Sequence, residues 1–584
     1  MAKEMARYRD KSRSGELSGE RWMHRVSARE VSILISLAIV AGLVSGISAI
    51  VLNLSVHSAV KWINQFHGSI WMIFLPAAGA ALSALYLRNW LRDSAGHGVP
   101  EIIRSVTMGG GRLRLDMIYS RLISSFLTVS SGGSAGLEGP IATSGGAIGS
   151  ALGRFFRLSE RRRILMVGYG VAGAVAAIFN APLTGTVFAL EVILREWSPL
   201  SILPTVIAAV SATQFSRLVM GNQIAFHHEI AHFSTVDLLA CVVMGLALGL
   251  LSTGFQRGLR ITEKQFDKLK WPHWLKAGVG GLLVGIGGYF MPSILHDGYL
   301  AIETYLSGVA GLTLVGVIGF LALKYFACCI TLGSGGSGGV FAPALVLGSS
   351  MGYGFGLLVR LIVPGMALAT PAAYSLVGMA GTVAGVMHAP LTGMFLVLEI
   401  TGGYDLILPL MIVSVLAMLL GYYFEEGSVY TRELVDSGLL ARRGSDLHLL
   451  QTMDARELLD AEDIVLHEGM LLGEFVEVFK SAKRNVFPVV EKKSRRWLGV
   501  VYLDDIRAYL FDQSLYNIMN MGSVTHSDLP IVDPKDSVLS AIEKFNSSGA
   551  WTLPMVENGK FLGMLSKSTL FDRYRSELVV HTAE

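Results

Sequence analysis

The sequence has little charge and few cysteines, and these shortages exclude several classes of protein. Only 16% of its 584 residues are charged, against about 25% in soluble globular chains. The three cysteines, Cys241, Cys328 and Cys329, lie in apolar segments, so they form neither a disulfide framework nor a metal site. The net charge of +3 is too small to indicate a nucleic-acid partner, and the chain has no zinc-ligand spacing and no P-loop lysine.

Long apolar segments fill most of the chain instead. Residues Val31 to Val60 include no Asp, Glu, Lys or Arg, and a membrane-spanning helix needs about 20 predominantly apolar residues. Similar segments lie near 70–87, 164–194, 199–216, 236–255, 274–296, 306–323, 325–359, 361–398 and 406–424. The sequence therefore predicts an integral, multi-pass protein of the cell inner or plasma membrane.

Composition divides the chain into four predicted parts. Residues 1–30 form a polar tail with eight Lys or Arg against five Asp or Glu, without a signal-peptide pattern, and the positive-inside rule places it in the cytoplasm. Residues 31–440 are predicted to be an all-α transmembrane domain with broken helices. Residues 453–512 and 516–576 are predicted to be two cytoplasmic α/β modules, because FPVVE (Phe487–Glu491) and LPMVE (Leu553–Glu557) begin similar strand and helix patterns.

Two pairs of motifs indicate that the membrane domain is internally repeated. SGGSAGLEGP at Ser131–Pro140 matches SGGSGGVFAP at Ser334–Pro343 at six of ten positions, 203 residues apart. APLTGTVFALEV at Ala181–Val192 matches APLTGMFLVLEI at Ala389–Ile400 at seven of twelve positions, 208 residues apart. Inverted repeats with broken helices are typical of transporters, whose substrate site lies at the repeat interface.

Glycine and proline break the apolar segments at these SGGS motifs and also in GHGVPE (Gly96–Glu101) and NAPLTG (Asn180–Gly185). Within a bilayer, broken helix must be buried in protein or line a watery cavity. A helix that begins there presents free N–H groups and a positive dipole end, which favour an anion. We expect these four breaks to aim at one site for a small anion. The alternative is that glycine and proline serve only close helix packing and kinks.

Glu138 distinguishes the two SGGS motifs, because Phe341 occupies its place in the second copy. A carboxylate in the membrane core is costly and indicates function. Beside an anion site it could compete with the anion and act as a gate, while Phe341 would form a fixed apolar wall. The alternative is that Glu138 only caps a helix N-terminus.

These motifs resemble those of the CLC family of voltage-gated chloride channels and chloride/proton antiporters. GHGVP resembles the family's GSGIP, GLEGP its gating motif and GVFAP its GxFxP, and Tyr430 follows the last apolar segment, where the family has a pore tyrosine. The resemblance implies a homodimer with one pore in each subunit. It also implies that Glu138 is the gate and that the backbone N–H groups of Val340 and Phe341 bind chloride. The Tyr430 hydroxyl is implied as a further donor to the anion.

Two positions depart from the family's pattern. His97 stands where the family has a pore serine, and because imidazole titrates near physiological pH, we expect pH-sensitive conduction unless the side chain points away from the pore. Val192 stands where antiporters of the family have a proton-relay glutamate. Valine cannot carry a proton, so we predict a chloride channel, with a chloride/proton antiporter that uses another proton route as the alternative. Glu191 and its repeat counterpart Glu399 are predicted to be structural.

The two C-terminal modules resemble a tandem pair of CBS domains, which can bind adenine nucleotides. The resemblance places Asp505 where a ribose-binding aspartate is often found, and Thr569 at the matching place in the second module. One of the two nucleotide sites is therefore expected to be poor. The alternative is that the pair only assists folding or dimer contact, and no cofactor is required for transport.

Two other functions are weighed against anion transport. A membrane receptor with the CBS pair as its output would make Glu138 and Tyr430 dispensable to ion flux. An intramembrane hydrolase would need Ser134 within hydrogen-bond reach of a histidine such as His388. The repeat accounts for Ser134 better, because Ser337 recurs without a second matched histidine. We therefore expect no enzyme activity.

Overall fold

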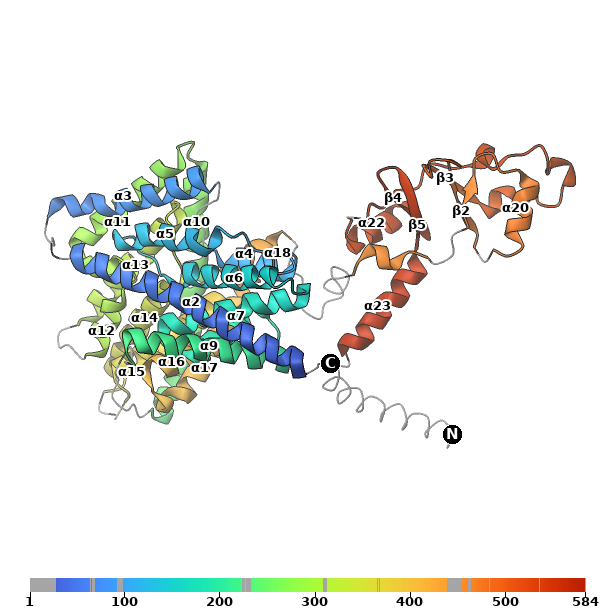
Figure 1. The fold of residues 1–584 in the computed structure, drawn as a ribbon. Helices are drawn as coiled ribbons and strands as arrows, with labels where there is room; N and C mark the ends of the chain where they lie inside the picture. The colour runs from blue at the N-terminus through green and yellow to red at the C-terminus, as the bar shows by residue number, and fades with distance from the viewer. Residues whose placement is uncertain are drawn as a thin grey trace, which may run out of the picture. The chain divides into compact units, whose positions relative to one another are not determined.

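The computed structural model describes residues 28–63, 65, 69–91, 98–222, 226, 233–307, 312–364, 366, 368–437, 453–460, 464–482, 484–534 and 536–582. The chain divides into two compact units, Met1–Ser437 and Gly438–Glu584, and both are drawn in Figure 1. Almost all of the predicted tail, 1–30, lies outside the described residues. His97 also lies outside them, so its place at the anion site stays a prediction.

Helices make up the described part of the first unit. Its first half contains α2 (Ala28–Ile63), η2 (Ile70–Phe74), α3 (Leu75–Leu85), η3 (Tyr86–Trp90), α4 (Val99–Thr107), α5 (Met117–Ser130), α6 (Glu138–Phe155), α7 (Glu160–Phe179), α8 (Pro182–Phe188), η4 (Ala189–Leu194) and α9 (Pro199–Met220). Its second half contains α10 (Thr235–Lys268), α11 (His273–Phe290), η5 (Pro292–Ile294), α12 (Tyr299–Leu306), α13 (Leu314–Gly333), α14 (Phe341–Ile362), α15 (Pro371–Met387), α16 (Pro390–Thr401), η6 (Tyr404–Leu406), α17 (Ile407–Phe424) and α18 (Arg432–Asp436). Among the described residues, eight helices are long and apolar enough to cross a membrane, which agrees with a multi-pass protein.

Matched helix pairs form the core of the two halves. In the first half α6 packs on α7, and α2 lies along α7 and α9 (Figure 1), while in the second half α14 packs on α15. A Cβ on Gly170 would lie 2.0 Å from the carbonyl oxygen of Gly145, and one on Gly378 would lie 2.3 Å from that of Gly348. Glycine is therefore required at these crossings, because small residues let membrane helices approach closely.

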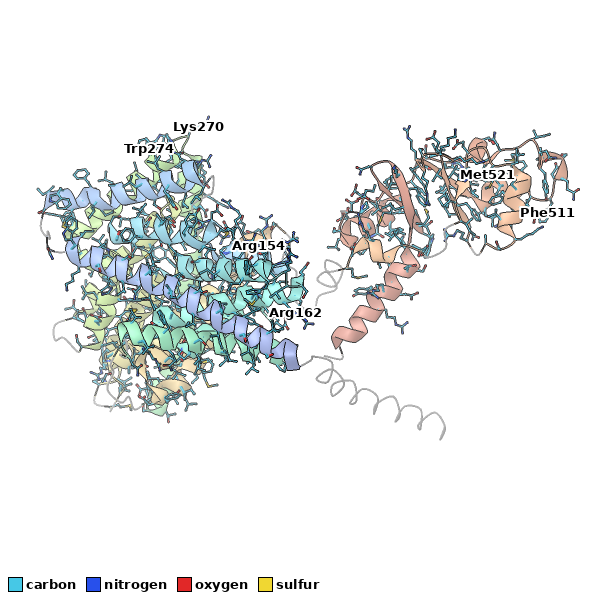
Figure 2. All side chains as sticks on the ribbon, viewed as in Figure 1. Arg154, Arg162, Lys270, Trp274, Phe511 and Met521 are labelled. Carbon is cyan, nitrogen blue, oxygen red and sulfur yellow. The ribbon has the colours of Figure 1, made fainter. Side chains whose placement is uncertain are left out.

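The outer surface of the first unit suits a bilayer. Large apolar side chains such as Leu239, Leu300 and Val315 are exposed on its helices, and in lipid such side chains lie in contact with acyl chains. Figure 2 shows Arg154 and Arg162 on the side of the bundle where α2 begins, and Lys270 and Trp274 at its upper edge. Basic and aromatic residues are enriched where helices leave the hydrocarbon. The arrangement supports the membrane assignment.

Reciprocal contacts relate the two halves. The N–H of Ser134 donates to Thr331 Oγ1 at 3.1 Å, and the N–H of Ser337 donates to Thr128 Oγ1 at 3.2 Å. Because 128 + 203 = 331 and 134 + 203 = 337, the second bond is the first with the halves exchanged. Such an exchange arises where two segments face each other across a local two-fold axis. The halves therefore meet as the repeat predicted.

The second unit contains two modules with a similar order of elements. The first has β1 (Leu466–His467), α20 (Leu472–Phe479), β2 (Val486–Val490), β3 (Trp497–Tyr502) and α21 (Leu503–Ile506), and η8 (Gln513–Leu515) and η9 (Met521–Val524) follow. The short η7 (Ala455–Leu458) precedes β1 in the chain, but its Ala455 and Leu458 pack in the core of the second module, whereas Met521 of η9 packs in the core of the first. The second has α22 (Val538–Ser548), β4 (Thr552–Glu557), β5 (Lys560–Ser566) and α23 (Lys567–Thr582). β1 pairs with β2 in parallel, β2 with β3 antiparallel, and β4 with β5 antiparallel. The rings of Trp497 and Phe561 stack at 5.4 Å between the modules.

Candidate anion site

The helices α6 and α14 begin at the same place, where the two glycine-rich segments meet. The N–H of Gly136 donates to the Gly339 carbonyl at 2.8 Å, and the N–H of Gly339 donates to the Gly136 carbonyl at 2.7 Å. A Cβ on Gly136 would lie 2.2 Å from a carboxylate oxygen of Glu138 and 3.0 Å from the Ala342 Cβ, so a larger residue here would displace the carboxylate. The repeated motif thus brings together the N-termini of two helices, one from each half.

Glu138 is the first residue of α6 and is directed at the start of α14. Its side chain is 4% exposed. Its Oε1 accepts a hydrogen bond from the Tyr299 hydroxyl at 2.8 Å, and its Oε2 accepts one from the Ala342 N–H at 3.4 Å. Free N–H groups and the helix dipole stabilise a negative charge at this end of a helix. An anion at the same end of α14 would have to compete with the carboxylate.

Phe341 and Val340 are both buried at the start of α14. The Phe341 ring packs against Phe179 at 5.3 Å and against Phe188 at 6.1 Å between ring centroids. Phe341 therefore belongs to an apolar surface beside the helix end. Binding of chloride by the N–H groups of Val340 and Phe341 stays a prediction, and the amide that faces the α6 carboxylate is that of the next residue, Ala342.

Tyr430 approaches the site from the segment after α17. It is 1% exposed and lies near enough to Glu138 for the two groups to interact electrostatically. Its N–H donates to Ser428 Oγ at 3.3 Å, and the N–H of Val429 donates to the Val386 carbonyl on α15 at 3.1 Å. The structure thus brings Tyr430 toward Glu138, whereas its role as a donor to chloride stays a prediction.

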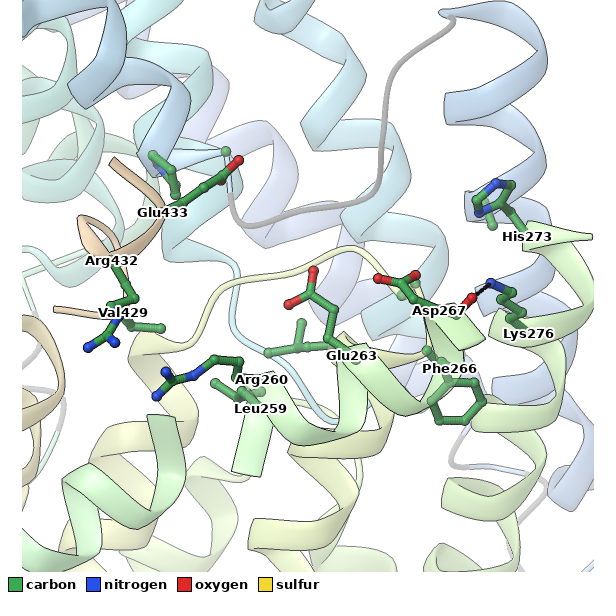
Figure 3. Close-up of a pocket in the computed structure, with 18 of the residues that line it drawn as sticks. Leu259, Arg260, Glu263, Phe266, Asp267, His273, Lys276, Val429, Arg432 and Glu433 are labelled. Carbon is green, nitrogen blue, oxygen red and sulfur yellow. Dashed lines mark hydrogen bonds between the residues drawn. The ribbon is translucent and has the colours of Figure 1, made fainter. Parts of the chain in front are cut away.

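A cavity of about 790 Å³ reaches the broken helices from one side. It is lined by Gly98 at the start of α4, by Ser334–Gly336 of the second glycine-rich segment, and by Val429. The charged residues that line it are Arg88, Glu101, Arg260, Glu263, Asp267, Lys276, Arg432, Glu433 and Asp436. Figure 3 shows the acidic residues of α10 between a group of arginines and the basic residues of α11. The cavity thus reaches two of the helix breaks and the residue before Tyr430, while Glu138 and Phe341 are not part of its lining.

Glu425 fixes two of the arginines in this cavity. It follows α17, is 3% exposed, and accepts hydrogen bonds from Arg257 at 2.6 Å, Arg260 at 2.8 Å and Arg432 at 2.6 Å. Burial by itself would raise the pKa of Glu425, but the hydrogen bonds from Arg257 and Arg260 outweigh it and lower the pKa. The ionised carboxylate therefore holds Arg260 and Arg432 at the cavity wall.

Glu191 and Glu399 cap helices in opposite halves. Glu191 accepts hydrogen bonds at the start of α16 from the N–H groups of Leu391 and Thr392 and from the Thr392 hydroxyl, at 2.7 to 3.1 Å. Glu399 accepts three equivalent bonds at the start of α8, at 2.6 to 2.8 Å. Carboxylates are favoured at this end of a helix. These contacts confirm the structural role predicted for both residues.

The expectation that all four helix breaks aim at one anion site is wrong for the NAPLTG segment. α8 begins in this segment, but the first N–H groups of that helix, on Leu183 and Thr184, are bonded to the carboxylate of Glu399. An N–H group that already donates to an ionised carboxylate does not attract a second anion. The sequence pattern of NAPLTG resembles that of the other three breaks. Only the tertiary structure shows that a side chain of the other half binds the N-terminus of this helix.

Val192, at the predicted relay position, is 5% exposed. It lies in the π-helical turn η4 that follows α8. The carboxylate before it, Glu191, is directed to α16. The relay position is therefore buried and has no titratable side chain, and the nearest carboxylate in the sequence has a structural partner.

Two residues near the site were missed by the sequence analysis. Tyr299 belongs to no motif, and nothing in its sequence neighbourhood indicates that its hydroxyl reaches Glu138. Lys324, in contrast, gives a usable signal, since a lysine within a transmembrane segment is rare and often functional. It is 0% exposed, and it occupies the place of Arg121 in the repeat, because 121 + 203 = 324.

The residues of the hydrolase alternative have other neighbours. Ser134 Oγ lies 3.1 Å from Cys328 Sγ, and the His388 ring lies 5.7 Å from that of Tyr422. Within the described part of the chain, no hydrogen bond joins Ser134 to His388. This is not the Ser–His contact that nucleophilic catalysis requires.

The two modules of the second unit differ at the predicted nucleotide position. Asp505 Oδ2 lies 2.9 Å from His526 Nε2, and both side chains are partly exposed. At the matching place in the second module, Thr569 Oγ1 donates to Asp460 Oδ1 at 2.6 Å. The first module thus presents an accessible carboxylate, whereas the second presents a hydroxyl that already has an acidic partner.

Comparisons with known proteins agree with this geometry. The family model described as voltage gated chloride channel matches residues 79–422, which is more than half of the chain. The CBS domain model matches residues 521–576, inside the second predicted module.

Individual relatives cover most of the chain. The H(+)/Cl(-) exchange transporter ClcA of Vibrio cholerae is 28% identical over 421 residues, which are 68% of this chain and 88% of the relative. The chloride channel protein CLC-f of Arabidopsis thaliana is 25% identical over 93% of this chain and 81% of the relative. The crystal structure of a slow cyanobacterial Cl⁻/H⁺ antiporter has a TM-score of 0.63 and 24% identity, over 70% of this chain and 99% of the other. The chain therefore belongs to the voltage-gated chloride channel family of anion-transport proteins and carries a CBS domain near its C-terminus.

Proposed function

We propose that this protein is a chloride channel that is gated by Glu138 and does not couple chloride movement to protons. The observation that carries the proposal is the pair Glu191 and Val192. Valine has no titratable group, and the carboxylate before it makes three hydrogen bonds at the start of α16. A carboxylate that completes a helix N-terminus is not free to swing between proton donors.

Gating in this proposal is competition at the start of α14. While Glu138 faces the Ala342 N–H, its carboxylate excludes an anion from that helix end. Once the side chain moves away, the N–H groups and the dipole of α14 become available to chloride. Phe341 cannot ionise and stays as the apolar wall. Partial charges bind an anion without holding it tightly, which suits conduction.

The test follows chloride and protons together. The purified full-length chain is reconstituted in chloride-loaded liposomes, and chloride efflux and external pH are recorded with valinomycin, with and without a protonophore. Chloride efflux without proton uptake supports a channel. Proton movement against its gradient, driven by chloride, would contradict it. Absence of flux for chloride and for other halides would favour the receptor alternative.

A chloride/proton antiporter is the second candidate, and the relatives favour it. One is named an exchange transporter, and the solved cyanobacterial relative is an antiporter. This candidate requires a proton route that avoids Val192. Liposomes distinguish the two candidates directly, because a fixed ratio of protons to chloride is expected only from the antiporter.

We propose three further properties that follow from the family. The chain forms a membrane-embedded homodimer, both termini lie in the cytoplasm, and the CBS pair binds an adenine nucleotide through Asp505. Light scattering of the detergent-solubilised protein tests the dimer. Protease accessibility in sealed vesicles tests the termini, and calorimetric titration with ATP tests the nucleotide.

A further inference from the structure

We propose that Tyr299 is a positioning residue that holds Glu138 in the position that excludes an anion, a role that rests on the proposed gate. The Tyr299 hydroxyl donates to Oε1 of the carboxylate at 2.8 Å, while Oε2 faces the Ala342 N–H at 3.4 Å. The two oxygens are thus held by two elements, α12 and α14. To leave the helix end, the carboxylate must give up both bonds.

The segment that carries Tyr299 has a fixed backbone. Tyr299 is the first residue of α12, and its N–H donates to Asp297 Oδ1 at 3.2 Å. Gly298 between them has a φ of 86°, a conformation that favours glycine. The Phe226 ring packs edge-on against the Tyr299 ring at 6.0 Å. The position of the Tyr299 hydroxyl is therefore fixed by these contacts at the start of α12.

A buried cation anchors the same segment. Lys324 is 0% exposed, and its Nζ donates to the carbonyls of Ile294 and His296 at 2.9 and 3.0 Å. His296 Nδ1 lies 2.7 Å from the Val129 carbonyl on α5, in the other half. A lysine inside a membrane domain is costly. Here its amino group donates to the backbone that leads to Tyr299.

The Tyr299 hydroxyl stabilises the Glu138 carboxylate against interactions that would move it away from the start of α14. Glu138 is 4% exposed, and Asp297, two residues before Tyr299, is an acidic side chain near enough to repel its carboxylate. Tyr430 also interacts with it electrostatically. Among the described residues, the one side-chain donor to this carboxylate is Tyr299. Removal of the hydroxyl should therefore shift Glu138 toward the displaced position.

The expected effect is large enough to measure. A hydrogen bond to a charged group changes such an equilibrium by roughly tenfold to a hundredfold. Tyr299→Phe keeps the ring and removes the bond. We expect a severalfold to tenfold rise in chloride efflux, limited by steps other than gating, and tighter chloride binding because the competing carboxylate is held less firmly.

The experiment compares five full-length proteins in liposomes: the wild type, Y299F, E138A, the double variant E138A/Y299F, and Y305F. The control Y305F loses a hydroxyl on the same helix, where the Tyr305 ring stacks on Tyr353 at 4.8 Å. Efflux with valinomycin is expected to rise in Y299F and to remain at the wild-type rate in Y305F. In the E138A background Y299F should add nothing, because the carboxylate that it releases is absent. Calorimetric chloride titration of each protein in detergent is the second measurement.

The other outcomes separate the positioning role from the gate. If E138A changes efflux but Y299F leaves both efflux and chloride affinity at wild-type values, Tyr299 does not hold the carboxylate and the gate stands. If Y299F has the same effect with and without Glu138, Tyr299 acts on the pore by another route and the inference is overturned. If E138A leaves efflux unchanged, the gate fails and the positioning role fails with it.

Discussion

The two halves of the membrane unit share the contacts that build the fold and differ at the position where the anion site is expected. Gly136 and Gly339 exchange matching backbone hydrogen bonds, and Glu191 and Glu399 cap each other's helices. Two residues after these glycines, Glu138 of the first half corresponds to Phe341 of the second. Residues that build the fold are therefore present in both halves, whereas the proposed gate needs a carboxylate in only one half.

The buried basic residues of the two halves also occupy matching positions but have different partners. Arg121 and Lys324 occupy matching places before the glycine-rich segments, and both are almost fully buried. Arg121 pairs with the Glu101 carboxylate at 3.0 Å, whereas Lys324 binds carbonyls of the segment that leads to Tyr299. The basic residue is thus at the same place in both halves, but it binds a carboxylate in the first half and backbone carbonyls in the second.

The largest expected effect comes from making the halves alike. Phe341→Glu places a carboxylate next to the rings of Phe179 and Phe188. An unpaired buried charge costs about 3–5 kcal/mol, so we expect loss of most of the folded protein. Thermal unfolding in detergent measures the loss, with Phe341→Leu as the control for changed shape. A stable Phe341→Glu protein would show that the apolar wall is not a structural requirement.

The helix caps should respond equally in the two halves. Glu191→Gln and Glu399→Gln each weaken three hydrogen bonds to a charged group at a helix N-terminus, and we expect each to lower the stability by about 1–3 kcal/mol. Thermal unfolding should give similar shifts for both. Chloride-driven proton flux should be absent in both variants, as proposed for the wild type. A change of proton coupling in Glu191→Gln alone would break the symmetry and assign that carboxylate to transport.

Much of the site could be predicted from sequence because its main parts are repeated. The matched motifs locate Glu138 and Phe341, and a repeat whose glycines meet at the interface brings both helix starts together. Tyr430 follows from its place after the last apolar segment. The predicted fold class is confirmed, and Glu138 lies at the start of α14 and within electrostatic range of Tyr430, whereas their roles in transport stay predictions.

The parts that sequence could not provide depend on contacts between distant residues. Tyr299 and Glu138 are 161 positions apart, and Arg257 and Glu425 are 168 apart. Neither pair lies at the repeat offset, so no periodicity indicates it. The NAPLTG break was misassigned for a related reason: a free helix N-terminus can receive a ligand or a side chain, and the choice of Glu399 is a property of tertiary packing.

A smaller effect is expected at Glu425, whose arginine partners line the cavity. Glu425→Gln weakens charge-assisted bonds to Arg257, Arg260 and Arg432, all partly exposed, so we expect a loss of about 1–2 kcal/mol. The pKa of this carboxyl is lowered in the folded state. The contribution of the Glu425 carboxylate to stability is therefore complete at pH values above the pKa that this carboxyl has in the unfolded chain. It is lost as the pH falls through the pKa of Glu425 in the folded protein.

The measurement is thermal unfolding of wild type and Glu425→Gln from neutral to acidic pH. The difference in unfolding temperature should be greatest near pH 7 and should disappear in acid. Glu426→Gln, one residue along the chain, is the matched control and should change little. A difference that is independent of pH would mean that packing, and not the charge of Glu425, holds the arginines.

The smallest effect on stability is expected in the second unit, where the two modules can be compared as the two halves were. The Asp505 and His526 side chains are about half exposed, so Asp505→Ala should change the stability by less than about 1 kcal/mol. Its proposed contact with a ribose is expected to matter more, with ATP binding weakened roughly tenfold by the loss of that hydrogen bond. Thr569→Ala removes a hydroxyl that already donates to Asp460 and should leave ATP affinity unchanged. Calorimetric titration of the full-length protein with ATP distinguishes the two modules. If both variants lose the same amount of ATP affinity, the nucleotide binds elsewhere. If the wild type does not bind ATP, the CBS pair has a purely structural role.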